Sequence, residues 1–285
     1  MNNNFKKIEI VIEQYLSWVP ISLTIREITR INALLKINHF TNAVKNKKKI
    51  IDIGCGDGKW WKFSGIKELK RIVGIDISRN EIKLANKIID ARLFNITDNN
   101  IIKKFDKKFD LAIGNCSMEH IRNINDALTN INRLLNVDGI FILILPTPDW
   151  AMNNTIISTV YKIFPRISMS FSGLINGFFQ HWHLYNYKVW IELLKNYGFK
   201  VENTYGLGNK NTSKIFWSFL PLSFFSFIIK FLTNRYFIFY LSSFIPRMIK
   251  IKVSSWIEKK LEKNLISPDD SEIFEYMIIC RKTKP

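Results

Sequence analysis

Short apolar runs alternate with amphipathic stretches along the first two thirds of the chain. Several runs end in Gly or Asp, which is typical of strands that are buried on both faces of a sheet. Apolar residues at helical spacing lie between them. The strands are predicted at 50–53, 72–75, 92–94, 111–114, 139–145 and 200–205, with an alternating strand at 273–281 and helices at 81–88, 125–135 and 188–197. This alternation predicts an α/β fold, a parallel sheet with helices on both faces.

Two regions outside the predicted sheet have a different pattern. Residues 1–46 carry apolar residues at helical spacing on both sides of Pro20, and we expect them to be helical. Between the sixth and the last predicted strand lies a long hydrophobic region where the sheet needs only a hairpin. We therefore divide the chain into an N-terminal helical segment (1–46), a core (47–205), a hydrophobic basic helical insert (206–270) and a closing strand with the tail (271–285).

Length and composition indicate a globular protein. A chain of 285 residues with 47% hydrophobic content can bury a full core, which argues against a disordered chain or a disulfide miniprotein. The three cysteines, Cys55, Cys116 and Cys280, cannot all pair, so we expect reduced thiols in a cytoplasmic compartment. Glu9 and Glu13 interrupt the first apolar stretch, and no signal peptide is expected there.

The net charge of +18 is unevenly distributed along the chain. No acid lies between Glu202 and Glu258, but seven basic residues do: Lys210, Lys214, Lys230, Arg235, Arg247, Lys250 and Lys252. They lie among aromatic and aliphatic residues, which favours an anionic membrane surface. Nucleic acid is the least favoured partner, because no base-flipping motif or added binding module is present.

The insert is too short and too broken to cross a bilayer in one helix. Its uncharged stretch at 215–229 contains Pro221 and would extend roughly 22 Å as a helix, less than the ~30 Å hydrocarbon core. One hypothesis is a helical cap or dimer face that protein covers. The other is a pair of interfacial helices, with Lys230, Arg235, Arg247, Lys250 and Lys252 facing lipid, which predicts a peripheral position at the inner face of the membrane.

The strongest chemical signal follows the first predicted strand. It is the run Asp52-Ile53-Gly54-Cys55-Gly56-Asp57-Gly58, whose glycines let the backbone turn tightly and approach a ligand at the start of the next helix. Asp76 ends the second strand, where a carboxylate can accept hydrogen bonds from both ribose hydroxyls of a nucleoside. Helix capping by Asp76 or Ser78 is the alternative.

These features resemble the class I S-adenosylmethionine-dependent methyltransferases, and the similarity continues downstream. Residues 109–121 resemble the family's fourth-strand signature, 133–146 its next helix and fifth strand, 181–199 the segment before its sixth strand and 278–282 its closing strand. The resemblance covers 48–205 and 273–282. It implies a Rossmann-like, seven-stranded, mostly parallel sheet, S-adenosylmethionine as the cofactor and methyl transfer as the activity.

The resemblance implies a role for each matching residue of the glycine run. Gly54, Gly56 and Gly58 would line the methionine and ribose part of the cofactor, with Cys55 in the same loop. Asp52 would orient this loop and the ammonium group of the cofactor.

Five further positions are implied to contact the cofactor. Asp76 would bind the ribose hydroxyls, Ile77 would pack on adenine, and Asn115 would lie close to the methionine moiety. The family usually has an acid after the third strand for the adenine amino group. Here the candidate is Asn95, followed by Ile96, and an amide can both accept and donate.

A nicotinamide-dependent dehydrogenase is the nearest alternative for the glycine run. That fingerprint requires a small residue where the helix packs on the strand. This sequence has Lys59, Trp60 and Trp61 there, so the dehydrogenase is not favoured.

Four residues are candidates for catalysis. Methyl transfer is an in-line displacement that depends on positioning, and a hydroxyl acceptor additionally needs a base. Glu119 and His120 follow the fourth strand, and His181 and His183 lie in a segment expected to cover the same edge. Capping or packing is the alternative for each. The His-x-His pair has no evident third ligand, so we expect no metal.

The sequence thus predicts a methyltransferase that acts on a small-molecule or lipid-linked acceptor and releases S-adenosylhomocysteine. The alternative is a non-catalytic, membrane-associated scaffold that retains the fold. An intact glycine run together with Asp76 argues against the scaffold, because a scaffold needs neither.

Overall fold

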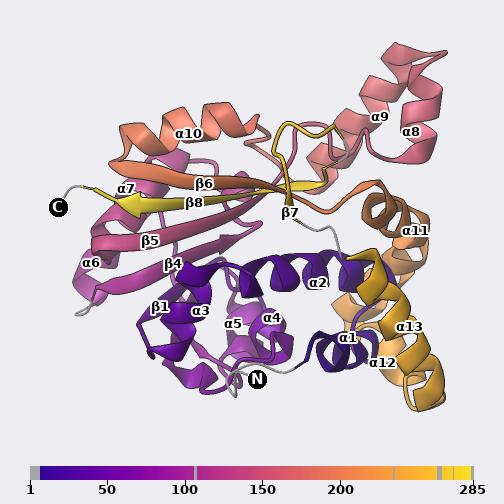
Figure 1. Cartoon of the computed structure of the whole chain (residues 1–285), viewed down its shortest axis with the longest axis horizontal. Helices are drawn as coiled ribbons and strands as arrows, with labels where there is room; N and C mark the ends of the chain where they lie inside the picture. Colours follow the sequence, from indigo (N-terminus) through magenta and orange to yellow (C-terminus); the bar gives the residue numbers. More distant parts are fainter. Residues whose placement is uncertain (1–6, 106–107, 234, 262–264, 272, 284–285) are drawn as a thin grey trace.

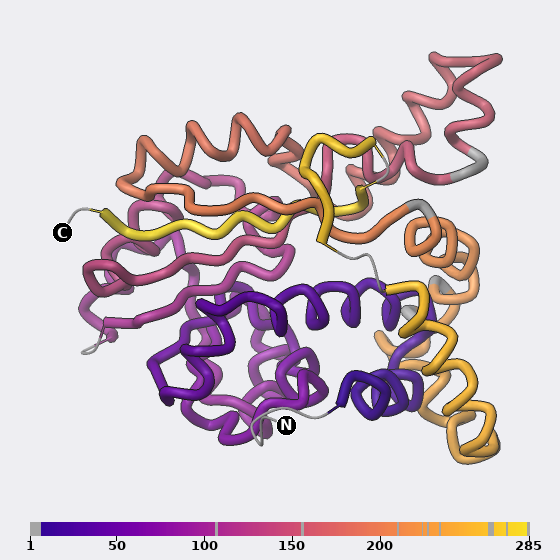
Figure 2. Tube along the Cα trace, viewed as in Figure 1, coloured from indigo at the N-terminus to yellow at the C-terminus, as the bar shows by residue number. Residues whose placement is uncertain are grey.

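A computed structural model describes residues 7–105, 108–233, 235–261, 265–271 and 273–283. The remaining positions of the predicted N-terminal segment, core, insert and closing strand lie outside the described residues. Figures 1 and 2 show a central sheet with helices on both faces and a group of helices at one end.

The sheet has eight strands in the order β3-β2-β1-β4-β5-β8-β6-β7. The strands are β1 (Ile50–Ile53), β2 (Ile72–Asp76), β3 (Asp90–Leu93), β4 (Phe109–Asn115), β5 (Leu135–Pro146), β6 (Phe199–Leu207), β7 (Leu265–Ile266) and β8 (Glu275–Lys282). Strands β1 to β5 are parallel, and β8 lies antiparallel between β5 and β6. The predicted fold class is confirmed. The additional strand, β7, has two residues and therefore no periodicity by which to recognise it.

The helices occupy the connections between strands and both elaborations of the core. They are α1 (Ile8–Leu16), α2 (Ile21–Leu35), α3 (Asn38–Lys45), α4 (Lys59–Phe63), α5 (Arg79–Ala85), α6 (Ile101–Lys104), α7 (Ile124–Leu134), α8 (Thr155–Tyr161), α9 (Pro165–Phe178), α10 (Tyr187–Asn196), α11 (Lys210–Thr233), α12 (Phe237–Leu241) and α13 (Arg247–Lys260), with 3-10 turns η1 (Leu69–Arg71) and η2 (Met118–His120). The prediction did not include α8 or α9; on α9, Ser168 and Ser172 are buried, whereas Ile167 and Phe171 are exposed. It also merged α2 with α3.

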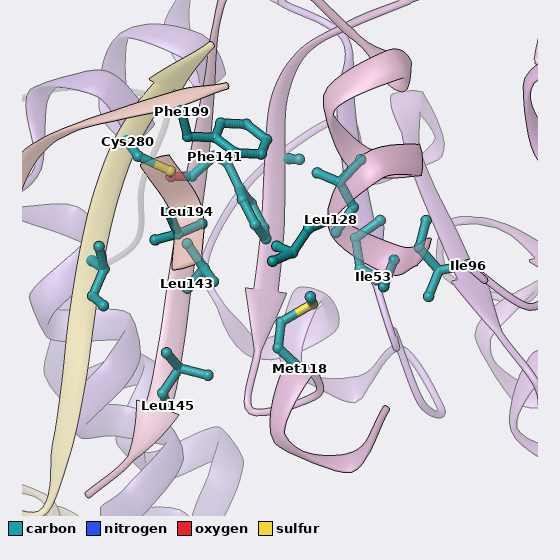
Figure 3. Packing of buried hydrophobic residues seen from close by; sticks show 14 of the residues in the cluster. Ile53, Ile96, Met118, Leu128, Phe141, Leu143, Leu145, Leu194, Phe199 and Cys280 are labelled. Carbon is teal, nitrogen blue, oxygen red and sulfur yellow. The ribbon is translucent and has the colours of Figure 1, made fainter. Parts of the chain in front are cut away.

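Each face of the sheet has its own apolar core. Along β5, Ile142 packs with residues of α3 and α5, whereas Leu143 packs with residues of α7 and α10. Figure 3 shows part of the second core, in which Phe141, Phe199 and Cys280 from three neighbouring strands lie close together. Burial on both faces explains why the strands are continuously apolar.

The N-terminal helices and the insert share a third core. Ile12 of α1 and Ile28 of α2 pack in one cluster with Phe216 of α11 and Ile257 of α13, and Figure 1 shows these helices side by side. The insert is therefore in part a helical cap covered by protein, the first of the two hypotheses. No described helix combines the length and the apolar character that crossing a bilayer would require.

Candidate active site

The glycine run forms a left-handed turn at the carboxyl end of β1. Gly54, Gly56 and Gly58 have φ angles of 76°, 53° and 71°, which glycine adopts without a Cβ clash. The amide nitrogen of Gly56 donates to Asp76 Oδ2 at 3.0 Å. A Cβ on Gly54 would lie 2.5 Å from the Cβ of Ser117, whereas a Cβ on Gly56 would meet no atom within 4 Å. A side chain therefore has no room at Gly54, whereas the space beside Gly56 is open to a ligand.

A first cavity, of about 450 Å³, lies between the ends of β2 and β4. Five predicted cofactor residues line it: Gly54, Asp76, Ile77, Asn95 and Ile96. The N-cap of α5 is Ser78, which accepts a hydrogen bond from Glu81. Asp76 is therefore not needed for that capping role. Ile77 is 74% exposed, so its apolar side chain is accessible to a ligand in this cavity.

A second cavity, of about 280 Å³, continues from the first on the other side of the glycine turn. The two cavities share Gly54, Cys116 and His120, and the second adds Cys55, Gly56 and Asn115. The buried Oδ1 atom of Asn115 has no hydrogen-bond partner among the described residues. An amino group of a ligand can satisfy this oxygen.

Two predicted cofactor residues lie elsewhere. The carboxylate of Asp52 is buried beneath the turn and accepts a hydrogen bond from Trp61 Nε1 at 2.6 Å; burial raises its pKa to about 7. A Cβ on Gly58 would lie 3.1 Å from the Cα of Ala85. Both residues shape the turn, and neither lines the two cavities.

The second cavity contains a buried ionic network that the sequence analysis did not identify. Glu275 of β8 is 1% exposed and accepts hydrogen bonds from Arg26 Nε at 2.6 Å and from Arg30 Nε and Nη2 at 2.9 and 2.5 Å. Burial alone would raise the pKa of Glu275, but the two guanidinium groups lower it to about 2. In the sequence, the only indication that the two arginines act together is their spacing of one helical turn on α2.

A second ionic group corrects one prediction for the insert. Lys230 of α11 does not face outward to lipid: its Nζ atom lies 3.7 Å from Asp57 Oδ2 and 3.6 Å from Glu81 Oε1. Burial lowers its pKa, but Tyr236, Asp57 and Glu81 outweigh burial and raise it above the usual value. Asp57 also pairs with Lys59. The insert therefore closes one side of the second cavity.

Three of the four predicted catalytic residues lie close together: His120 lines both cavities, His181 lines the second, and Glu119 is buried beside them. Glu119 and His120 belong to η2, and one carboxylate oxygen of Glu119 lies 3.6 Å from His120 Nε2. The rings of His120 and His181 are 5.1 Å apart between centroids. Burial raises the pKa of Glu119, and burial together with nearby His120 lowers the pKa of His181 to about 3. Both imidazoles face the cavity opening.

His183 does not join this group. Its Nδ1 atom lies 2.9 Å from the hydroxyl of Tyr185 and its Nε2 atom 2.9 Å from the carbonyl of Ile121. It lines neither cavity. We conclude that His183 holds its segment against η2, which is the packing alternative for this position.

The sequence relationship agrees with this geometry. A family model described as a methyltransferase domain matches residues 26–204. The chain belongs to this family. The match runs from α2 to β6 and includes the glycine run, Asp76 and the cluster at η2. The predicted class I methyltransferase is confirmed, and with it S-adenosylmethionine as the cofactor.

Similar proteins agree at the level of the fold. The chain is 27% identical over 205 residues to an uncharacterized protein of Methanocaldococcus jannaschii, covering 67% of this chain and 79% of that protein. A proposed sarcosine dimethylglycine methyltransferase of Galdieria sulphuraria has a TM-score of 0.51 at 14% identity, over 90% of this chain and 85% of that one. The plantazolicin methyltransferase BamL, solved with a triazolic desmethylPZN analog and SAH, has a TM-score of 0.50 at 14% identity, over 90% and 86%.

Proposed function

We propose that this methyltransferase acts on a lipid-linked acceptor, a molecule with a polar head and an apolar chain. The observation that supports the proposal is a third cavity, of about 520 Å³, between α1, α2 and the insert. Its lining is almost entirely apolar, and Val19 lines both this cavity and the second one. An apolar chain in the third cavity would place a head group in the second.

The donor is held by the first cavity and the glycine turn. S-adenosylmethionine supplies an electrophilic methyl group on a sulfonium centre. Asp76 would accept from the ribose hydroxyls, Ile77 would cover one face of the adenine, and Asn95 would contact its edge. Asn115 Oδ1 would accept from the ammonium group, since it is buried without another partner among the described residues. The open space above Gly56 admits the methionine part of the donor.

The acceptor is activated where the cavities join. His120 lines both cavities and His181 lines the second, and Glu119 is buried directly behind them. We propose that this cluster binds the acceptor's hydroxyl oxygen and removes its proton, so that the oxygen can attack the methyl group in line. The Arg26–Arg30–Glu275 network supports one wall of the same cavity and holds α2 to β8.

We further propose that the protein lies against the inner face of the membrane. Large apolar side chains are exposed on α9 and on the insert, which lie at the same end of the molecule (Figure 1). They include Ile167, Met169, Phe171 and Leu174 on α9 and Leu222, Phe225, Phe231 and Met248 on the insert. Arg235, Arg247 and Lys252 are exposed among them, and basic groups at such a surface attract anionic lipid.

The acceptor class is tested by filling the third cavity. Ser226 is buried in the wall of this cavity. Ser226→Phe should raise KM for a polyprenyl- or acyl-linked acceptor about tenfold, because the new ring would displace roughly two methylene groups of the chain from the cavity. KM for a short analogue with the same head should not change. The matched control is Asn125→Phe, an exposed site on α7. Equal KM values for the two acceptors in the wild type would contradict the proposal, whereas product from either would exclude a non-catalytic scaffold.

A further inference from the structure

The cluster of Glu119, His120 and His181 has the composition of a metal site. One ligand atom from each residue lies within 4.8 Å of the other two. We propose that these three residues bind a divalent transition-metal ion such as Zn²⁺ at the junction of the first and second cavities. The role of the ion in methyl transfer rests on the proposed function, whereas its binding does not.

The carboxylate of Glu119 is the first reason. Glu119 is 0% exposed, and neither of its oxygens has a hydrogen-bond partner among the described residues. An isolated buried carboxylate costs several kcal/mol unless a cation or a donor compensates it. His120 Nε2, at 3.6 Å, is beyond hydrogen-bond range. A cation between the two would satisfy both groups.

The hydrogen bonds of His120 are the second reason. Its Nδ1 atom lies 3.2 Å from the carbonyl of Gln180, and a carbonyl can only accept, so Nδ1 carries the proton. The lone pair is then on Nε2, which faces Glu119. A metal-binding histidine commonly donates its other ring N–H to a carbonyl in this way, which fixes the tautomer and the orientation of the ring.

The surroundings of His181 are consistent with the same arrangement. Trp150 Nε1 lies 2.9 Å from Asn176 Oδ1 and 3.1 Å from His181 Nδ1. The indole N–H donates to both atoms; binding of an ion through Nε2 selects the tautomer with the proton on Nδ1, which can then donate to the same Asn176 oxygen at 3.4 Å. The lone pair of His181 is then on Nε2. The backbone amides of Trp182 and His183 donate to the carbonyl of Glu119 at 2.8 and 3.2 Å, which ties the two segments together.

The distances require a small closure around the ion. Metal bonds of about 2.0–2.2 Å place cis ligand atoms roughly 3–3.5 Å apart, which is less than the 4.8 Å limit of the cluster. The exposed ring of His120 can move by this amount about its side-chain torsions. Arg26 lines the same cavity as His120 and His181, and its charge is compensated by the buried Glu275 at 2.6 Å.

The ligand set determines the kind of ion and its chemistry. Two imidazoles and one carboxylate suit Zn²⁺, Fe²⁺ or Mn²⁺, and three protein ligands leave a coordination position for substrate. With the ion bound, the cluster would act through the ion and not as the base itself: an acceptor hydroxyl bound there would have a lowered pKa and would lose its proton to solvent. The oxygen then bonds to the methyl carbon as the C–S bond breaks and its electron pair goes to sulfur, which gives the methyl ether and S-adenosylhomocysteine.

The three candidate metal ligands differ from the His181 and His183 pair considered in the sequence analysis. The expectation of no metal rested on the His181 and His183 pair, which lacked a third ligand. In the fold, His183 lies against Ile121 and Tyr185, and the ligands beside His181 come from η2, about sixty positions earlier in the chain. That proximity exists only after the loop before α10 packs on η2.

The experiment measures metal binding without donor or acceptor. The full chain, free of any histidine tag and stripped with chelator, is titrated with Zn²⁺ by calorimetry and with Co²⁺ by visible absorption. We expect one equivalent per chain and a Co²⁺ d–d band. Glu119→Gln, His120→Asn and His181→Asn should each weaken Zn²⁺ binding at least about tenfold, the lower bound for losing even an outer-sphere partner. His39→Asn, at an ion pair with Glu202 on the other side of the sheet, should change it less than twofold.

Each outcome decides the proposal. No stoichiometric binding by the wild type, or an equal loss in His39→Asn, would overturn the metal site. S-adenosylhomocysteine affinity, measured on the same samples, separates this result from the proposed function. Retained binding of that ligand in all variants shows that they are folded and that the cofactor site stands independently of the metal. Loss of both ligands in a variant with wild-type circular dichroism would contradict separate sites.

Discussion

Replacing the buried acid of β8 should destabilise the protein strongly at neutral pH. Glu275→Gln removes the charge that compensates Arg26 and Arg30, and Arg30 is only 3% exposed. Removing one partner of a buried ion pair typically costs about 3–5 kcal/mol; here Arg26 loses its carboxylate partner, whereas Arg30 keeps Glu27 at 3.2 Å. The pKa of Glu275, lowered from 4.5 to about 2, corresponds independently to about 3 kcal/mol. We therefore expect a loss of about 3–5 kcal/mol in the free energy of unfolding.

The same residue should dominate the acid dependence of stability. Because the folded-state pKa of Glu275 is depressed, its contribution is fully present above the unfolded-state pKa of 4.5 and is lost as pH falls through about 2. The wild type should thus lose about 3 kcal/mol between pH 4.5 and pH 2 beyond what Glu275→Gln loses over the same window.

Urea unfolding at pH 7 and at steps down to pH 2 measures both effects. The control is Glu202→Gln: Glu202 pairs with Arg281 and His39 but is partly exposed, so its loss should cost about 1 kcal/mol or less. A loss below about 1 kcal/mol in Glu275→Gln, or parallel pH profiles for wild type and variant, would refute the reasoning.

Three further predictions concern the donor site and the exposed apolar surface. Asp76→Ala should weaken S-adenosylhomocysteine binding in calorimetry roughly tenfold to hundredfold, because a hydrogen bond to a charged group contributes about 1.5–3 kcal/mol; an unchanged Kd would argue against the ribose contact. Gly54→Ala should weaken the same binding at least about tenfold, since its Cβ would meet Ser117 at 2.5 Å in a left-handed backbone that costs about 1–2 kcal/mol. Its control, Gly173→Ala, has open space around the new Cβ and should raise the unfolding free energy by about 0.5–1 kcal/mol; equal effects of the two changes would contradict the argument. Phe231→Ser, at a side chain that is 87% exposed, should reduce flotation with anionic vesicles without lowering Tm, and undiminished flotation would exclude this face as the contact.

The order of strands and helices in the core could be predicted from the sequence. Strands such as Ile50–Ile53 and Phe109–Asn115 are buried on both faces, so their apolar runs are visible without any tertiary information. The glycine run is equally visible, because its left-handed turn is a local requirement of the backbone. Asp76 was marked by its place at the end of a strand, whereas Ile77, Asn95, Ile96 and Asn115 were implied by the family resemblance; all five line the cavities.

The tertiary structure decided everything that depends on segments distant in the chain. Glu275 meets Arg26 and Arg30 across about 250 positions, and nothing near any of the three residues marks the others as partners. For Lys230 the sequence pattern gave a wrong partner. A basic residue in an apolar helix predicts a contact with lipid, but in the fold Lys230 lies beside Asp57.

The sequence by itself thus determined the fold class and the left-handed glycine turn, because periodicity and turn chemistry are local properties, and its motifs carried the resemblance to the family. Only the folded chain decided which acids meet which bases, which histidines share a cavity, and that the N-terminal helices and the insert enclose one apolar chamber. The physical reason is that ion pairing, burial and cavity shape act over distances of a few ångströms in space, whereas sequence patterns record only neighbours along the chain.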